Sequence, residues 1–497
     1  MSGVASVYRP RIAGWGAPSL GTAIVVVIGA IFGVVAIFVA PLETRWIVYG
    51  IAALGFVTLA LAFPHPERLV WGGFVLSFQA DVCVRFFYGR ASTPGIPVGL
   101  QVVAGGLVVA AYAFSGKFKR LRPFWWGGRL ALPIAGFFAT SLLALPTSGE
   151  RFVGVAEVLV ELQCYFVYLL ALNAVRSEEQ LDRTVRLLFI ALGIQSIVYF
   201  IESALRITFS LTGEVTPELG VVPRPGGTVA TNPAGFASFI LPILLIAVAH
   251  VVSSRKRGRD LYVGGLVALG VTALTLTFTR ASWTAFAIAL TWLLCVAARR
   301  GTLRLGRIVP VGIAVCIAIV LFWPMIQLRL ADSPVGDAYG ERAGLMRMAL
   351  RVIAAQPLTG VGPGAYMYTF KAFLTPELRD QWLAPVHNAY LLRAAEAGIP
   401  GGLAWVILLV AGLRQAARLT RSRRPLIRVT AIGWSAGLLA LCWEMSWDIW
   451  RGFTYNALLW FLLGLMEAAE RIARGAPSPA GYGSGSTERT AGGLASS

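Results

Sequence analysis

The 497-residue chain has few charged residues. Only 13% of its residues are Asp, Glu, Lys or Arg, and 57% are hydrophobic. Ordinary soluble proteins carry roughly 25% charged residues. This composition excludes a disordered chain and argues strongly against a set of soluble domains. Apolar stretches of about 18 to 22 residues recur along the sequence, each long enough to cross a bilayer core of roughly 30 Å. We therefore predict an all-α polytopic membrane protein.

Residue types that build metal sites are scarce. The chain has three histidines and five cysteines, and every cysteine lies in an apolar stretch without metal-ligand spacing. The sequence contains no HExxH motif, no DxD pair and no Cys/His cluster. We expect neither a metal nor another cofactor.

The apolar pattern predicts about 12–14 transmembrane helices. The candidate spans lie near residues 20–40, 46–63, 69–87, 97–114, 126–145, 152–175, 184–207, 235–252, 261–279, 283–298, 308–325, 390–413, 429–447 and 454–470.

Orientation follows from the cations, which give the chain a net charge of +19. Of the 43 lysines and arginines, 19 lie in four short loops, 115–129, 253–260, 299–307 and 414–428. With the spans above, these loops share one face with both termini, and the positive-inside rule makes that face cytoplasmic. The positive charge therefore indicates membrane orientation and not binding of nucleic acid.

Five regions are predicted along the chain, and the third is a long, partly helical loop on the outer face, opposite the cytoplasmic one. They are N-terminal transmembrane helices over 1–207, central transmembrane helices over 208–325, the large periplasmic loop 326–386, C-terminal transmembrane helices over 387–474 and a disordered cytoplasmic tail over 475–497.

One histidine is placed where it could do chemistry. His387 alone is predicted on the outer face, at the start of an amphipathic helix that continues into the membrane. An imidazole titrates near pH 6.5, so at a protected outer site it could accept a proton from a hydroxyl. A structural role is the alternative interpretation.

Two outer arginines are the other candidates. Arg280 lies in a tight turn between two spans, and Arg224 lies in a Gly/Pro-rich segment just before a span. A guanidinium stays charged and can donate two parallel hydrogen bonds to a phosphate. Snorkelling to lipid headgroups is the alternative for Arg280, and a solvated loop charge is the alternative for Arg224.

Two further features have simpler interpretations. The Gly/Pro-rich segment 360–364 lacks the context of a phosphate-binding loop, so we interpret it as a turn. Several carboxylates lie in or near spans, where they could serve transport or form interhelical salt bridges: Glu157, Glu161, Glu202, Glu396, Glu444 and Asp448.

Three segments resemble the O-antigen ligase and polysaccharide polymerase family of bacterial membrane glycosyltransferases. Residues 279–283 (Thr-Arg-Ala-Ser-Trp) are similar to the family's Thr/Ser-Arg-Gly/Ala motif, and residues 224–233 resemble its Arg…Gly-Thr…Asn-Pro segment. The stretch from 360–362 (Gly-Val-Gly) to His387 and Gly398 resembles its C-terminal signature.

The resemblance implies a GT-C-like fold and a metal-independent transfer. The donor would be a glycan on undecaprenyl diphosphate. The acceptor would be lipid A-core for a ligase or another lipid-linked glycan for a polymerase. By position, His387 would be the general base, and Arg280 and Arg224 would bind the diphosphate. Asn388 and Tyr390 would also contact substrate. Lipopolysaccharide or exopolysaccharide biosynthesis is the expected process, and the bacterial inner membrane is the expected location.

A polytopic transporter or a flippase for lipid-linked oligosaccharides is the alternative. Transport sites usually lie near the bilayer midplane, on broken helices within inverted repeats. The sequence shows no such repeat, and the strongest candidate residues lie at one face.

Overall fold

The computed structural model describes residues 66–86, 96–114, 124–207, 224–230, 232–253, 257–324, 326–327, 335–374 and 385–475. The chain divides into two units, Met1–Pro66 and Glu67–Ser497, and all described residues except Pro66 belong to the second. The predicted spans 20–40 and 46–63 and the predicted tail beyond residue 475 lie outside the described residues.

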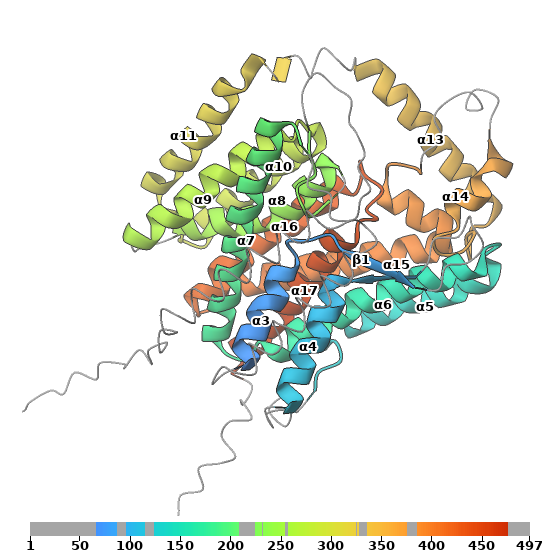
Figure 1. The fold of residues 1–497 in the computed structure, drawn as a ribbon, viewed down its shortest axis with the longest axis horizontal. Helices are drawn as coiled ribbons and strands as arrows, with labels where there is room; N and C mark the ends of the chain where they lie inside the picture. Colours follow the sequence, from blue (N-terminus) through green and yellow to red (C-terminus); the bar gives the residue numbers. More distant parts are fainter. Residues whose placement is uncertain are drawn as a thin grey trace, which may run out of the picture. The chain divides into compact units, whose positions relative to one another are not determined.

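The described part is almost entirely helical (Figure 1). Its helices and strands are α3 (Pro66–Ser77), β1 (Cys83–Phe86), β2 (Ile96–Gly99), α4 (Leu100–Phe114), α5 (Ala131–Ala144), α6 (Arg151–Ala174), α7 (Glu178–Leu205), α8 (Pro233–Ser253), α9 (Arg257–Leu276), α10 (Arg280–Arg299), α11 (Leu305–Leu321), α13 (Val335–Ala355), α14 (Tyr366–Thr369), α15 (Ala389–Leu419), α16 (Pro425–Glu444) and α17 (Phe453–Ala473), with short 3-10 turns at Gly128–Leu130, Leu145–Thr147 and Phe370–Phe373.

Seven helical segments within the described residues are long and apolar enough to cross a membrane. They are Gly128–Thr147, Arg151–Ala174, Glu178–Leu205, Pro233–Ser253, Arg280–Arg299, Ala389–Leu419 and Pro425–Glu444. Each coincides with a span predicted from the sequence. The prediction of an all-α polytopic membrane protein is confirmed.

The predicted span 69–87 is wrong. Helix α3 ends at Ser77, and the chain continues into β1, which pairs antiparallel with β2. Polar contacts stabilise the segment between α3 and β1: the Gln101 side-chain amide donates to the Ser77 and Ala80 carbonyls, and the Thr454 hydroxyl donates to Asp81 at 2.7 Å. A short apolar stretch fits a strand as well as a helix, which is why the pattern was ambiguous here.

Helix α8 lies at the centre of the bundle and is buried at nearly every position. It packs most extensively against α16, where glycines allow the backbones to approach closely. A Cβ added at Gly433 would lie 2.4 Å from the Ile246 Cα, and one added at Gly437 would lie 2.9 Å from the Pro242 Cα. This contact fixes α16, whose last residue, Glu444, reaches the candidate site.

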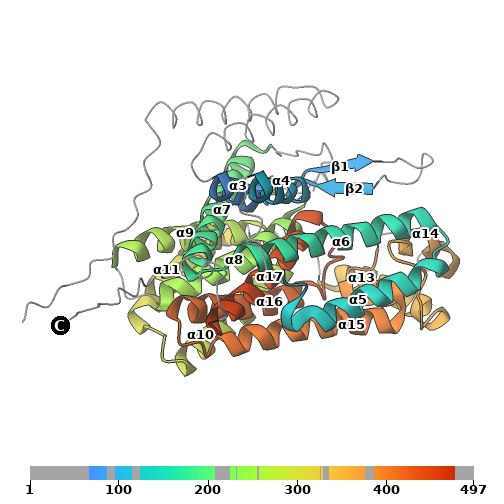
Figure 2. The same ribbon diagram turned by 90° about the horizontal axis from the view of Figure 1, so that it is seen from below.

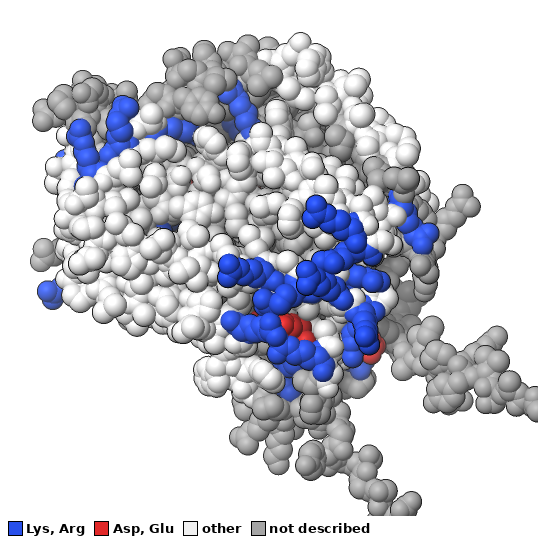
Figure 3. Space-filling model, turned by 180° about the vertical axis from the view of Figure 1, so that it is seen from behind, with Lys and Arg blue, Asp and Glu red and all other residues white. Residues whose placement is uncertain are grey.

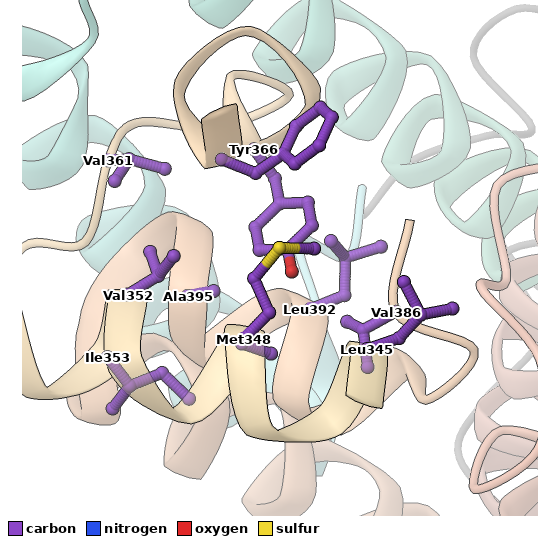
Figure 4. Close-up of a cluster of buried hydrophobic side chains, with 11 residues drawn as sticks. Leu345, Met348, Val352, Ile353, Val361, Tyr366, Val386, Leu392 and Ala395 are labelled. Carbon is purple, nitrogen blue, oxygen red and sulfur yellow. The ribbon is translucent and has the colours of Figure 1, made fainter. Parts of the chain in front are cut away.

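Helices α5, α6 and α15 run side by side, and α14 lies near the end of this group where α5 leads into α6 (Figure 2). At that end α13 packs on the first turns of α15. The apolar cluster between them includes Met348, Val352, Tyr366, Leu392 and Ala395 (Figure 4). The large loop therefore contains helices and has its own hydrophobic contacts, in agreement with the predicted partly helical loop 326–386.

The C-terminal ends of α10 and α15 carry cations. Lys and Arg side chains gather densely on one part of the surface (Figure 3). The Arg300 Nε donates to the Thr420 hydroxyl at 3.1 Å, and the Arg304 amide donates to the Val252 carbonyl at 3.0 Å. These contacts bring the cationic loops 299–307 and 414–428 and the end of α8 together. We call the part around Arg300 and Thr420 the cationic end.

Candidate functional site

Arg224 holds the turn that precedes α10. Its Nε donates to the Thr277 carbonyl at 2.9 Å, and its Nη2 lies 3.5 Å from the Phe278 carbonyl and from the Thr279 hydroxyl. Arg280 follows directly as the first residue of α10. The two arginine motifs, which are far apart in the sequence, therefore meet at one turn.

The backbone of this turn is strained. Phe278 is buried and has a φ of 49°. A non-glycine residue in this conformation costs about 1–3 kcal/mol and persists where its surroundings hold it. The bonds from Arg224 to the carbonyls on this turn supply part of that support. The turn presents Arg280 at a helix N-terminus, where the macrodipole favours an anion.

The start of α10 is joined to the end of α16. The Ser282 hydroxyl donates to the Glu444 carboxylate, and the Trp443 indole donates to the Thr284 hydroxyl at 2.8 Å. The chain beyond Glu444 therefore leaves α16 beside the turn that carries Arg280.

The same end of α16 holds the segment that contains His387. The Ala389 amide donates to the Met445 carbonyl at 2.8 Å, and the Tyr390 hydroxyl donates to the Cys442 carbonyl at 2.8 Å. The Asn388 side chain accepts from the Leu391 amide at 3.0 Å, which makes it the N-cap of α15, and donates to the Ser446 carbonyl at 3.3 Å. The polar groups of Asn388 and Tyr390 thus bond to protein backbone. That these side chains contact substrate stays a prediction.

His387 lies in a charged environment formed by two residues from other elements. Burial lowers its pKa below the ordinary value near 6.5. The Asp448 carboxylate opposes this shift, the Arg342 guanidinium adds to it, and a hydrogen bond with the Pro385 backbone opposes it. The net shift keeps the imidazole neutral at neutral pH, which is the form that a general base needs.

Asp448 comes from the loop between α16 and α17. Burial raises its pKa above the ordinary value, against the lowering effects of the Ile449 amide, His387 and Arg342. That amide donates to the Asp448 Oδ1 at 2.7 Å. Arg342 comes from α13, in the large loop. Sequence reasoning did not connect either residue with His387, because both are distant in the chain and belong to no motif. The weak signals available were a carboxylate just after a span and a cation on an amphipathic helix.

The contacts form one continuous path along this end of the molecule. Arg224 bonds to the turn before Arg280, α10 bonds to Glu444, and the residues after Glu444 bond to the segment around His387. We call this set of residues the transfer site, and it stands at the end of α10, α15 and α16 that lies away from the cationic end.

The Gly/Pro-rich segment 360–364 is a turn, as predicted, and it docks on a kink in α15. The Val361 and Gly362 amides donate to the Ala395 and Glu396 carbonyls at 3.0 and 2.9 Å. At the kink Gly398 has a φ of 71°, and a Cβ there would lie 2.3 Å from the Leu358 carbonyl oxygen. Only glycine fits at this position, which explains why a glycine follows the histidine in the motif.

Two of the candidate carboxylates form ion pairs. Glu161 on α6 pairs with Arg393 on α15, and Glu396 pairs with Arg451. The Arg393 guanidinium also lies 4.3 Å from the Phe137 ring centroid. Of the two interpretations left open by the sequence, the structure shows an interhelical salt bridge for Glu161 and, for Glu396, a salt bridge to Arg451 in the loop between α16 and α17. Within the described ranges, no group of three or more His, Cys, Asp or Glu side chains could hold a metal ion.

Comparison with known protein families places this geometry in context. Residues 265–406 match the model of a family described as O-antigen ligase. The match covers 142 of the 497 residues, and this part of the chain is similar to the O-antigen ligase family. The resemblance inferred from the motifs is thereby confirmed, and the matched O-antigen ligase region contains Arg280, Arg342, His387 and Gly398. Arg224 and Asp448 lie outside it. A search of curated proteins finds no match.

Proposed function

We propose that this chain is a metal-independent glycosyltransferase of the bacterial inner membrane. It moves a glycan from undecaprenyl diphosphate to a sugar hydroxyl at the periplasmic face, as an O-antigen ligase or a surface-polysaccharide polymerase. The observation that carries the proposal is the transfer site, in which Ser282, two residues after Arg280, donates to Glu444, and the segment that follows His387 donates to the carbonyls of Met445 and Ser446. The Asp448 carboxylate of the same loop acts on His387 through its charge. The O-antigen ligase region supports the same chemistry.

The transfer needs a base and an anion site. His387 takes the proton from the acceptor hydroxyl as its oxygen bonds to the anomeric carbon of the donor glycan. The bond between that carbon and the diphosphate oxygen breaks, and the electron pair leaves with undecaprenyl diphosphate. Arg280 and the N-terminus of α10 stabilise the negative charge on the leaving group.

Arg224 has two tasks in this scheme. It fixes the turn that aims Arg280, and its remaining guanidinium surface adds positive charge beside the diphosphate. Asp448 raises the pKa of His387, and Arg342 lowers it. A lipid-linked donor suits a site of this kind, because the diphosphate is itself the leaving group and no nucleotide is needed.

Purified protein incubated with undecaprenyl-diphosphate glycan, with and without lipid A-core, tests the proposal. Glycan attached to the core identifies a ligase, and a ladder of longer prenyl-linked chains identifies a polymerase. Proteoliposomes that move the lipid-linked glycan across the membrane without forming a glycosidic bond would contradict both assignments and favour a flippase.

A further inference from the structure

A pocket of about 320 Å³ lies at the cationic end, between α10, α15 and α16. Five arginines line it: Arg299, Arg300, Arg414, Arg418 and Arg421. Trp292, Val296 and Ala417 form apolar parts of its wall, and Ser435 of α16 lies behind them. The pocket is at the far end of these helices from the transfer site, so the proposed glycan transfer does not use it.

The pocket is strongly positive and structurally defined. None of the ion pairs within the described residues involves any of these five arginines. The Arg300 Nε is fixed by the buried Thr420 hydroxyl at 3.1 Å, and the Trp292 indole donates to the Ser435 hydroxyl at 3.2 Å. Five cations converging on one concavity repel one another, so an anion bound there would be stabilised by all of them.

Exposed apolar side chains form a stripe on each of α10 and α15, and each stripe ends at one of these arginines. On α10, Ile288 and Trp292 are 39% and 41% exposed and share a helix face with Arg299. On α15, Ile407 and Val410 are 56% and 38% exposed and precede Arg414 at helical spacing on one face. In a helix that crosses a membrane, such a stripe faces acyl chains, and the arginines then stand at headgroup level.

We propose that this pocket binds the phosphate headgroup of an acidic phospholipid from the leaflet at the cationic end. The acyl chains lie along the stripes of α10 and α15, and Trp292 packs at the boundary between chain and headgroup. A free phosphate offers the same charge, but it makes no use of the two apolar stripes. Basic pockets between transmembrane helices recognise anionic headgroups by this combination of charge and apolar surface.

Native mass spectrometry of the purified full-length chain tests the assignment with two lipids, dioleoylphosphatidylglycerol and dioleoylphosphatidylcholine. We expect the wild type to bind the acidic lipid about tenfold or more tightly than the zwitterionic one. The pocket variant R299Q/R418Q/R421Q should lose most of this preference. The control variant R186Q/R304Q/R423Q removes three exposed arginines that do not line the pocket and should bind as the wild type does.

Thermal unfolding of each variant shows whether it is folded, and Arg418→Glu provides a single reversal of charge if the triple variant is not. Equal losses in the pocket and control variants would show diffuse attraction and overturn the proposal. So would a wild type that does not discriminate between the two lipids. Displacement of the acidic lipid by an equal concentration of inorganic phosphate would identify a free-anion site and overturn the lipid assignment.

Discussion

His387 is the residue on which the proposed transfer chemistry depends most directly. Replacing it with alanine removes the base but leaves Arg280 and the helix N-terminus in place. We expect His387→Ala to lower the rate of transfer by about 10²–10⁴-fold, the usual contribution of a general base, without weakening donor binding. His250→Ala is the matched control. His250 lies in the last turn of α8 and contacts Thr430 at 3.2 Å within the bundle, and α8 is not one of the helices whose ends form the transfer site. Transfer by His387→Ala at the wild-type rate would exclude the histidine as base.

The charged neighbours of His387 determine in which direction the pH dependence of transfer should shift. Transfer requires the neutral imidazole, so activity falls as the pH drops through the pKa of His387, which burial lowers. Asp448 raises that pKa and Arg342 lowers it. The acid limb of the kcat/KM profile should therefore move to lower pH in Asp448→Asn and to higher pH in Arg342→Gln. A purely structural role for either residue would change the rate or the amount of folded protein without moving the acid limb.

At the level of elements, the kink of α15 couples the large loop to the transfer site. Gly398→Ala places a methyl group 2.3 Å from the Leu358 carbonyl oxygen at a φ of 71°, so the turn at 360–364 cannot keep its bonds to α15. We expect a loss of about 1–3 kcal/mol in stability, measured by thermal unfolding in detergent, together with reduced transfer. Gly136→Ala is the control, because no atom lies within 4 Å of a Cβ there and a helical alanine is favoured by about 1 kcal/mol. Equal stabilities of the two variants would contradict this account of the kink.

The elements also show what sequence patterns can and cannot predict here. Long apolar segments such as those of α8 and α10 were predictable, because the bilayer sets their length. The motif histidine, the two arginines and the role of 360–364 as a turn followed from local residue types. The hairpin of β1 and β2 did not, because its short apolar strands have no periodicity that distinguishes them from a helix. The proximity of Asp448 and Arg342 to His387 could not be predicted from the sequence either, because it depends on how the α16–α17 loop and α13 pack.

At the level of the whole molecule, the transfer site and the cationic end occupy opposite ends of α10, α15 and α16. We predict that the transfer site faces the periplasm and the cationic end faces the cytoplasm. Two exposed positions report on these ends, Gln356 after α13 and Arg423 between α15 and α16. In a background with the five cysteines replaced by alanine, a membrane-impermeant maleimide added to intact spheroplasts should label Gln356→Cys and leave Arg423→Cys unlabelled until lysis. Labelling of both positions from outside would show that these ends do not lie on opposite sides of the membrane. The reverse pattern would put the transfer site on the cytoplasmic side, away from periplasmic acceptors.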